Sequence, residues 1–162
     1  MKRAALLLAL AALTSGCGLR PLYGGGTNSA AASLLREVSV QPIAGRTGWL
    51  VRNALVDRLG TNDDSPRYRL EVELDDDLTG FGVRGDTSVT RERRTLRARY
   101  RLVDSSNGQV LLDASAGSDA GIDVVGSEYA TVAAEQTAVE RLAQVVADQI
   151  VARLGLYAVR QR

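Results

Sequence analysis

Apolar and polar residues alternate along several stretches of the chain, at the two-residue period of half-buried β-strands. The clearest stretch is residues 67–74, where tyrosine, leucine and valine alternate with arginine and glutamate. The same alternation recurs over residues 89–103 and from residue 110 onwards, and a shorter one covers residues 35–43. The pattern therefore predicts four strands. Pro42 cannot donate to a sheet ladder, so the first strand ends there at a sheet edge or leaves the sheet.

Two other stretches show the three-to-four-residue spacing of amphipathic helices. In residues 47–59, leucine and alanine recur at this spacing, and Thr47 is a suitable cap for the first turn. Gly60 and the Asn-Asp-Asp-Ser-Pro segment that follows it end this helix. In residues 129–154 an apolar stripe runs along the whole stretch, with charged side chains elsewhere, and Gly155 is placed to end it.

The segments between the predicted strands carry turn residues. Residues 79–87 contain three glycines and predict a hairpin loop, and Asn107-Gly108 is a strong signal for a second hairpin. Residues 117–127 are rich in glycine and irregular, so they either extend the last strand or form a mobile loop. Such short connections favour an antiparallel meander of the last three strands, which the first strand joins through the helix.

The order strand, helix, strand, strand, strand, helix predicts the fold class. Each strand has one apolar face and each helix one apolar stripe. The simplest arrangement packs two helices on one face of a four-stranded, mostly antiparallel sheet, which is an α+β two-layer sandwich. The other face of the sheet is then polar and open to water, as antiparallel sheets allow. The pattern leaves the order of the strands open.

The first residues have the pattern of a secretory signal peptide. Two basic residues, an apolar run from Ala4 to Leu13 and small residues come before Cys17. This run is shorter than the roughly 20 apolar residues that a membrane-spanning helix needs. The arrangement resembles a bacterial lipobox, in which the peptide is cut before the cysteine and the thiol is lipidated. Cys17 is the chain's only cysteine. The alternative is an ordinary signal peptide followed by a free thiol.

Three regions follow from these patterns. Residues 1–16 form the lipoprotein signal peptide. Residues 17–33 form the lipidated N-terminus and a flexible tether, because glycine, serine and alanine occur there with no hydrophobic period. Residues 34–162 form one domain, which suits their length.

Composition argues against several functions. The chain has 20 basic and 19 acidic side chains, and Lys2 and Arg3 lie in the signal peptide, so no basic excess points to nucleic acid. It has no histidine, the commonest general base and metal ligand. We therefore expect no enzymatic activity, cofactor or metal. The run Asp75-Asp76-Asp77 could hold a hard cation, but a solvated strand end is the favoured interpretation.

The strand predicted over residues 89–103 carries the candidate binding residues. Its polar face consists of Thr95 and five arginines: Arg91, Arg93, Arg97, Arg99 and Arg101. Pairing of neighbouring strands would bring Glu71 and Glu73 near Arg97 and Arg99, and Asp113 near Arg99. The arginines then either form a solvated, charge-paired face or contact an anionic partner. A phosphorylated glycolipid and the carboxylates of another protein are two such partners. Arg91, Arg93 and Arg101 are the predicted surplus.

Several segments together resemble the lipopolysaccharide-assembly lipoprotein family, LptE. The sharpest is the predicted mature start, Cys17-Gly18-Leu19-Arg20-Pro21-Leu22-Tyr23-Gly24. It is supported by the helix from Gly45-Arg46 to Leu59, the Tyr68-Arg69-Leu70 strand and the strand from Arg97 to Leu102.

The resemblance implies a non-catalytic lipoprotein, anchored in the outer membrane by its N-terminal lipid and facing the periplasm. Members of the family partner the β-barrel LptD as a plug and assembly factor, and they contact lipopolysaccharide on its way to the outer leaflet. Gly18 follows the cysteine where lipoproteins of the inner membrane commonly carry aspartate, so the outer membrane is expected. The alternative function is an accessory subunit of another envelope lipid transporter.

Overall fold

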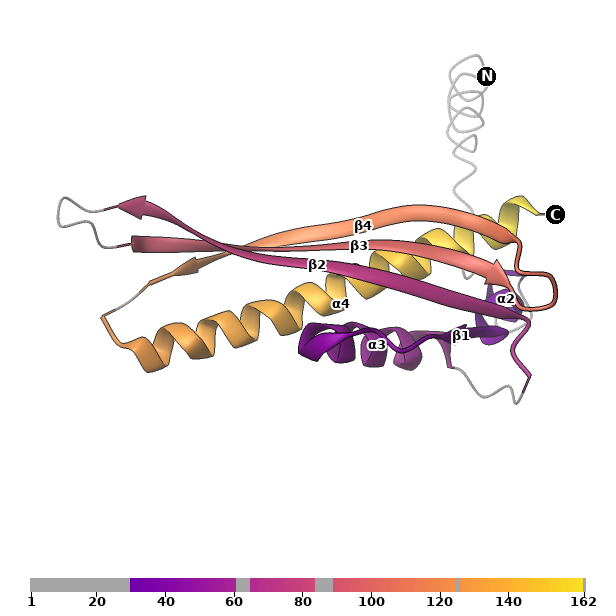
Figure 1. Ribbon diagram of the computed structural model, residues 1–162, viewed down its shortest axis with the longest axis horizontal. Coiled ribbons are helices and arrows are strands. Elements are labelled where there is room, and N and C mark those ends of the chain that lie inside the picture. The colour runs from indigo at the N-terminus through magenta and orange to yellow at the C-terminus, as the bar shows by residue number, and fades with distance from the viewer. Residues whose placement is uncertain (1–29, 61–64, 84–88, 125, 162) are drawn as a thin grey trace, which may run out of the picture.

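The computed structural model describes residues 30–60, 65–83, 89–124 and 126–161, which form a sheet with helices packed on one side (Figure 1). The strands are β1 (Val38–Val40), β2 (Tyr68–Val83), β3 (Val89–Asp104) and β4 (Val110–Asp123). The helices are α2 (Ala30–Arg36), α3 (Gly45–Leu59) and α4 (Glu128–Arg160). The predicted α+β fold, with a four-stranded and mostly antiparallel sheet, is confirmed.

The strands lie in the order β1-β2-β3-β4. β1 pairs with β2 in parallel, because α3 carries the chain back between them, and the other two pairings are antiparallel. β2 and β4 are longer than predicted. The predicted loop over residues 79–87 is wrong for residues 79–83, which continue β2 against β3. Residues 117–123 extend β4, which was one of the two alternatives for that segment.

The ends of α3 and α4 differ from the prediction in two places. Thr47 is not a cap, since α3 begins at Gly45 after Ala44, which makes no side-chain cap bond. Gly155 does not end α4 but is buried inside it, and the helix continues to Arg160. Gly60 does end α3: it adopts φ 62°, in the left-handed region, and its N–H donates to the Val56 carbonyl. A residue without a Cβ adopts that conformation at little cost.

α2 was not predicted at all. It occupies residues that the sequence patterns assigned to the end of the tether and to the first strand. Leu35, expected in a strand, is a buried helical residue whose side chain joins the core. Ala31 and Ala32 are strong helix formers, and packing against α4 stabilises the short helix.

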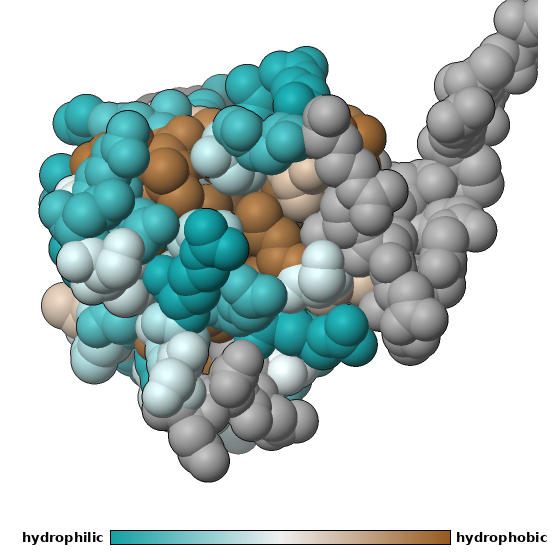
Figure 2. Space-filling model, turned by 90° about the vertical axis from the view of Figure 1, so that its right-hand side faces the viewer, coloured by the Kyte–Doolittle hydropathy of each residue, from teal (hydrophilic) through white to brown (hydrophobic). Residues whose placement is uncertain are grey.

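The core lies between the sheet and the helices. Leu70, Leu96 and Leu102 from the sheet and Ile150 and Leu154 from α4 have no exposed surface. Viewed from the end that carries α2, apolar residues are visible between hydrophilic surfaces (Figure 2). α4 is long and apolar enough to cross a membrane by length and composition, but half of its most apolar window is buried. A core helix meets the same criterion, and α4 packs on β3, β4, α2 and α3.

Candidate functional site

The five candidate arginines of β3 project from the face of the sheet opposite the helices. The residues between them face the core: Leu96, Ala98 and Tyr100 are buried, while Arg97 and Arg99 are exposed. This alternation places all five candidate arginines on the open face, together with Arg69 of β2.

The neighbouring strands bring carboxylates to the same face. In the register of the sheet, Arg97 lies opposite Asp75 of β2, and Arg91 lies opposite Asp123 of β4. By the alternation of side chains along β2 and β4, seven acidic residues lie on this face: Glu71, Glu73, Asp75, Asp77, Asp113, Asp119 and Asp123. The open face therefore carries both positive and negative side chains, and arginine is not in excess on it.

Most candidate arginines are paired with these carboxylates. The arginine of each pair is named first, with its nitrogen-to-oxygen distance: Arg91 and Asp123 at 3.0 Å, Arg93 and Asp119 at 4.0 Å, Arg99 and Asp113 at 2.9 Å, and Arg101 and Glu71 at 3.1 Å. The arginines predicted as surplus, Arg91, Arg93 and Arg101, are thus all paired. Exposed pairs of this kind contribute about 0.2–1 kcal/mol each, so an anionic ligand can displace the carboxylates at small cost.

The pair of Arg99 and Asp113 was predicted, and it is bidentate, since Nε donates to Oδ1 at 3.3 Å and Nη2 to Oδ2 at 2.9 Å. The hydrogen bonds from Arg99 lower the pKa of the Asp113 carboxyl, and in turn they raise the pKa of Arg99. Glu73 lies opposite Arg99 as expected.

Glu71 lies opposite Arg101, one pair further along than Glu73 and Arg99, and it lines the same small space as those two residues. Its carboxylate also accepts a hydrogen bond from Arg69 at 2.9 Å. This bond is the largest cause of the lowered pKa of Glu71, and Arg101 adds to it. The space among Glu71, Glu73, Arg99 and Arg101 measures only about 40 Å³, which suits a water molecule but no larger ligand.

Arg97 differs from the other candidates, because it makes no ion pair within the described part of the chain. Its side chain lies across Gly117 of β4. A Cβ at residue 117 would be 2.6 Å from Nη1 of Arg97 and 2.7 Å from its Cδ. Glycine at that position therefore leaves room for the arginine, and Arg97 is the candidate cation most available to an anionic partner.

Sequence reasoning missed an ion pair on the other face of the sheet. Asp76 points toward the helices, where its carboxylate accepts hydrogen bonds from Nε (2.8 Å) and Nη2 (2.7 Å) of Arg94 and from the Thr47 hydroxyl (2.7 Å). The bonds from Arg94 are the largest cause of the lowered pKa of Asp76. A signal existed, since Asp76 and Arg94 are charged residues at core-facing positions of adjacent strands.

The same geometry bears on the run of three aspartates. Asp76 projects to the face opposite that of Asp75 and Asp77, because successive strand residues alternate. No group of three or more Asp, Glu, His or Cys residues arranged to hold a metal ion exists among the described residues. Cys17, the predicted lipidation site, lies outside those residues.

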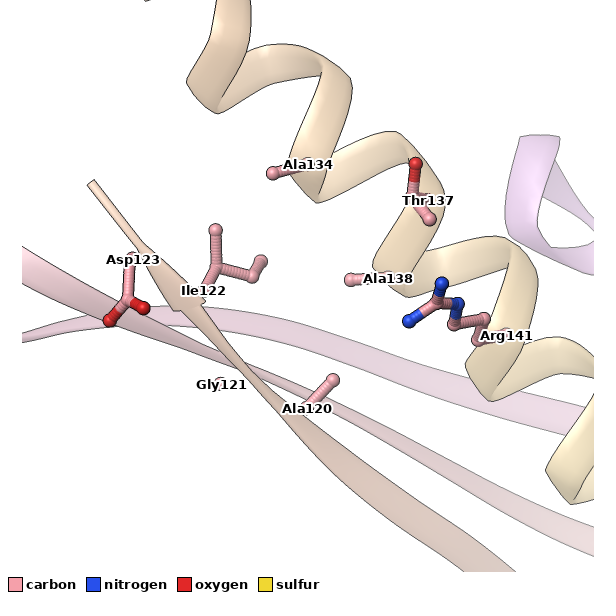
Figure 3. Close-up of a pocket in the computed structure, with 8 residues that line it drawn as sticks. All are labelled: Ala120, Gly121, Ile122, Asp123, Ala134, Thr137, Ala138 and Arg141. Carbon is pink, nitrogen blue, oxygen red and sulfur yellow. The ribbon is translucent and has the colours of Figure 1, made fainter. Parts of the chain in front are cut away.

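A larger hollow lies between β4 and α4 (Figure 3). It measures about 370 Å³ and is lined by Ala120, Gly121, Ile122 and Asp123 of β4 and by Ala134, Thr137, Ala138 and Arg141 of α4. No hydrogen bond or ion pair in the described structure spans it between these residues. Its lining consists of small apolar residues and Ile122, with Asp123, Thr137 and Arg141 as the polar residues.

Several known proteins resemble this chain. An uncharacterized protein of Rickettsia prowazekii (strain Madrid E) is 26% identical over 155 residues, which cover 96% of this chain and 97% of that protein. A crystal structure from Caulobacter crescentus CB15, described as a lipoprotein, matches with a TM-score of 0.65 and 27% identity over 83% of this chain and 98% of that one.

Two further solved structures share the fold at 14% identity. They are a minor lipoprotein from Acinetobacter baumannii, with a TM-score of 0.60 over 75% of this chain and 92% of that one, and the rare lipoprotein B from Shewanella oneidensis, with a TM-score of 0.55 over 76% and 97%. The family described as LptE, lipopolysaccharide-assembly, matches residues 35–154, which include α3, α4 up to Leu154 and the whole sheet. Because that match spans most of the chain, the protein belongs to the LptE family.

Proposed function

We propose that this protein is a non-catalytic outer-membrane lipoprotein, anchored through a lipidated Cys17, that partners an LptD-like β-barrel. In this role it acts as a plug and assembly factor and contacts lipopolysaccharide during its insertion into the outer leaflet. The observation that carries the proposal is the match of the lipopolysaccharide-assembly family to residues 35–154.

The open face supports the proposal. A plug in a water-filled barrel needs a polar surface whose charged groups pair with one another when the protein is alone. When the protein is bound, the same groups must be able to pair with the barrel instead. The paired arginines and carboxylates form such a surface, because their exposed ion pairs are weak. The same face can meet polar side chains of a barrel wall with four of its five candidate arginines already paired.

Contact with lipopolysaccharide is assigned to the arginines of β3. The candidates are Arg91, Arg93, Arg97, Arg99 and Arg101. Arg97 is the first choice, since it is exposed and no carboxylate engages it within the described part of the chain. A planar guanidinium matches the oxygens of a phosphate group and binds it in a bidentate manner.

Affinity purification of the full-length lipidated chain from detergent-solubilised envelope tests the barrel partnership. We expect an equimolar complex with a large β-barrel protein that survives mild detergent at room temperature. The matched control is Cys17→Ser, which removes the anchor but leaves the folded domain unchanged. Isolation of the chain alone, or with subunits of a different envelope lipid transporter, would contradict the proposal.

A binding assay with purified lipopolysaccharide tests the arginine assignment. We expect Arg97→Ser to weaken binding severalfold, whereas Arg153→Ser, which removes the same charge from exposed α4 surface, leaves it unchanged. Equal losses in the two variants would show that net charge, and not this face, determines binding.

A further inference from the structure

β4 forms one edge of the sheet, so half of its backbone hydrogen-bonding groups face away from β3. The hydrogen bonds of the Gln149 side chain on α4 show which backbone groups of β4 face away from β3. Its amide oxygen accepts from the Gly117 N–H at 3.0 Å, and its amide nitrogen donates to the Gly117 carbonyl at 3.3 Å. Because paired residues alternate along an antiparallel ladder, the N–H and C=O groups of Asp119, Gly121 and Asp123 point in the same outward direction.

These outward groups have no partner among the described residues. Asp119, Gly121 and Asp123 are all exposed, and no hydrogen bond from α4 reaches their backbone as Gln149 reaches Gly117. Backbone N–H and C=O groups of a strand normally form hydrogen bonds. A strand edge with a row of unpaired groups is therefore a template on which another strand can pair. The structure thus covers the edge at residue 117 and leaves it open at residues 119–123.

The 370 Å³ cleft lies beside this open stretch of the edge. Figure 3 shows Ile122 pointing toward the helix and Ala134 and Ala138 pointing back toward the strand, while Asp123 points to the other face of the sheet. A strand added at the edge would place every second side chain into this cleft. The alanines leave room for side chains of moderate size.

An exposed strand edge beside a helix-lined cleft binds extended peptides by strand addition: main-chain bonds supply affinity, and the cleft selects alternate side chains. We propose that residues 119–123 of β4 accept an extended segment of a partner protein as an additional strand. This inference goes beyond the proposed function, because it holds whichever protein supplies the segment.

Charge indicates the chemistry of that segment. On the cleft side, Ala120, Ile122 and the alanines of α4 favour small or medium apolar side chains. On the open face, Asp119 and Asp123 flank Gly121, and each has an arginine of β3 on its inner side. A partner strand would meet these carboxylates from their outer side, so it carries basic or neutral polar residues there. A second copy of this chain is disfavoured, because antiparallel pairing about Gly121 would place Asp119 of each copy opposite Asp123 of the other.

Site-specific photo-crosslinking in the native envelope tests the proposal. The full-length lipidated chain carries a benzophenone amino acid at Gly121, where an added Cβ meets no atom within 4 Å. The matched control carries it at Asp57, an exposed position on helix α3. We expect Gly121 to crosslink to neighbouring residues of one protein segment, mapped by mass spectrometry, in which apolar and basic or polar residues alternate. Crosslinks only to lipid, only to a second copy, or to no molecule would overturn the proposal.

A backbone substitution separates strand addition from other contacts. Asp119→Pro removes the outward N–H but no bond to β3, whereas Asp119→Ala removes only the carboxylate. With the crosslinker at Gly121, we expect the proline variant to give a yield about fivefold lower than the alanine variant, the effect of losing one hydrogen bond. Equal yields from two equally stable variants would refute main-chain pairing.

A second variant tests the cleft without changing the strand. Ala134→Trp fills the cleft from α4, and Ala133→Trp adds the same side chain at the neighbouring exposed position, which does not line the cleft. We expect only Ala134→Trp to lower the crosslinking yield. This comparison still tests whether the partner segment binds in the cleft if Asp119→Pro fails to fold. The same yield from both tryptophan variants would exclude the cleft as part of the site.

Discussion

The ion pair between Asp76 and Arg94 joins the sheet to α3, and its removal gives the sharpest test of this structure. Asp76→Ala deletes a carboxylate that accepts two hydrogen bonds from Arg94 and one from Thr47. It leaves the guanidinium between the layers without its partner. The change should therefore destabilise the domain and should not affect the open face.

The magnitude follows from burial. Both side chains of the pair are 20% exposed, well below those of the open-face pair of Arg99 and Asp113, at 65% and 42%. Fully exposed pairs contribute up to about 1 kcal/mol, and breaking a buried pair costs about 3–5 kcal/mol. Asp76→Ala should therefore lower the free energy of unfolding by about 2 kcal/mol, between these limits.

Urea denaturation of the chain lacking residues 1–17 measures this loss. Arg94→Met and the double variant complete a mutant cycle, whose coupling energy isolates the pair. The matched control is Asp113→Ala, where we expect a much smaller loss because the pair is exposed. A loss for Asp76→Ala no larger than that for Asp113→Ala would refute the argument from burial.

The same pair predicts a pH dependence. Hydrogen bonds from Arg94 lower the pKa of Asp76 below its ordinary 3.8 in the folded state. The carboxylate therefore contributes its full stability above that ordinary value, and the contribution is lost as the pH falls through the lowered folded-state pKa. The difference in unfolding free energy between the wild type and Asp76→Ala should be constant near neutral pH and shrink below about pH 4. A difference that grows on acidification would contradict this assignment.

Three further substitutions test the packing. Ile150→Ala, at a residue with no exposed surface, should lower the free energy of unfolding by about 3 kcal/mol in the same urea assay. Gly48→Ala should cost about 2 kcal/mol, because the new Cβ would lie 2.7 Å from the backbone carbonyl oxygen of Ile43, which cannot move aside cheaply. Gly117→Ala would push aside the Arg97 side chain and place a Cβ 3.0 Å from the backbone carbonyl oxygen of Leu96, so the melting temperature should fall modestly while lipopolysaccharide binding changes. Unchanged stability in the first two variants, or unchanged binding in the third, would contradict the packing described.

Local patterns were sufficient to predict much of this protein. The alternation in residues 67–74 and 89–103 located β2 and β3 and identified which face of each carries the charges. The long apolar stripe located α4, and the Asn107-Gly108 turn located the hairpin before β4. These features depend on neighbours in sequence, because a strand or helix period records which side of an element is buried.

Tertiary contacts decided the features that local sequence leaves open. Glycines at 80 and 82 suggest a loop, yet pairing with β3 keeps residues 79–83 in a strand, and packing on α4 holds α2 in a helix that is short for isolated stability. The register set which carboxylate each arginine lies opposite. Arg97 lies opposite Asp75, yet its side chain lies over Gly117 and makes no ion pair within the described part of the chain. Where α4 leaves the edge of β4 open depends on how two elements distant in sequence pack. The residue pattern within β4 or α4 specifies which face of each element is buried. It does not specify how closely the other element covers that face.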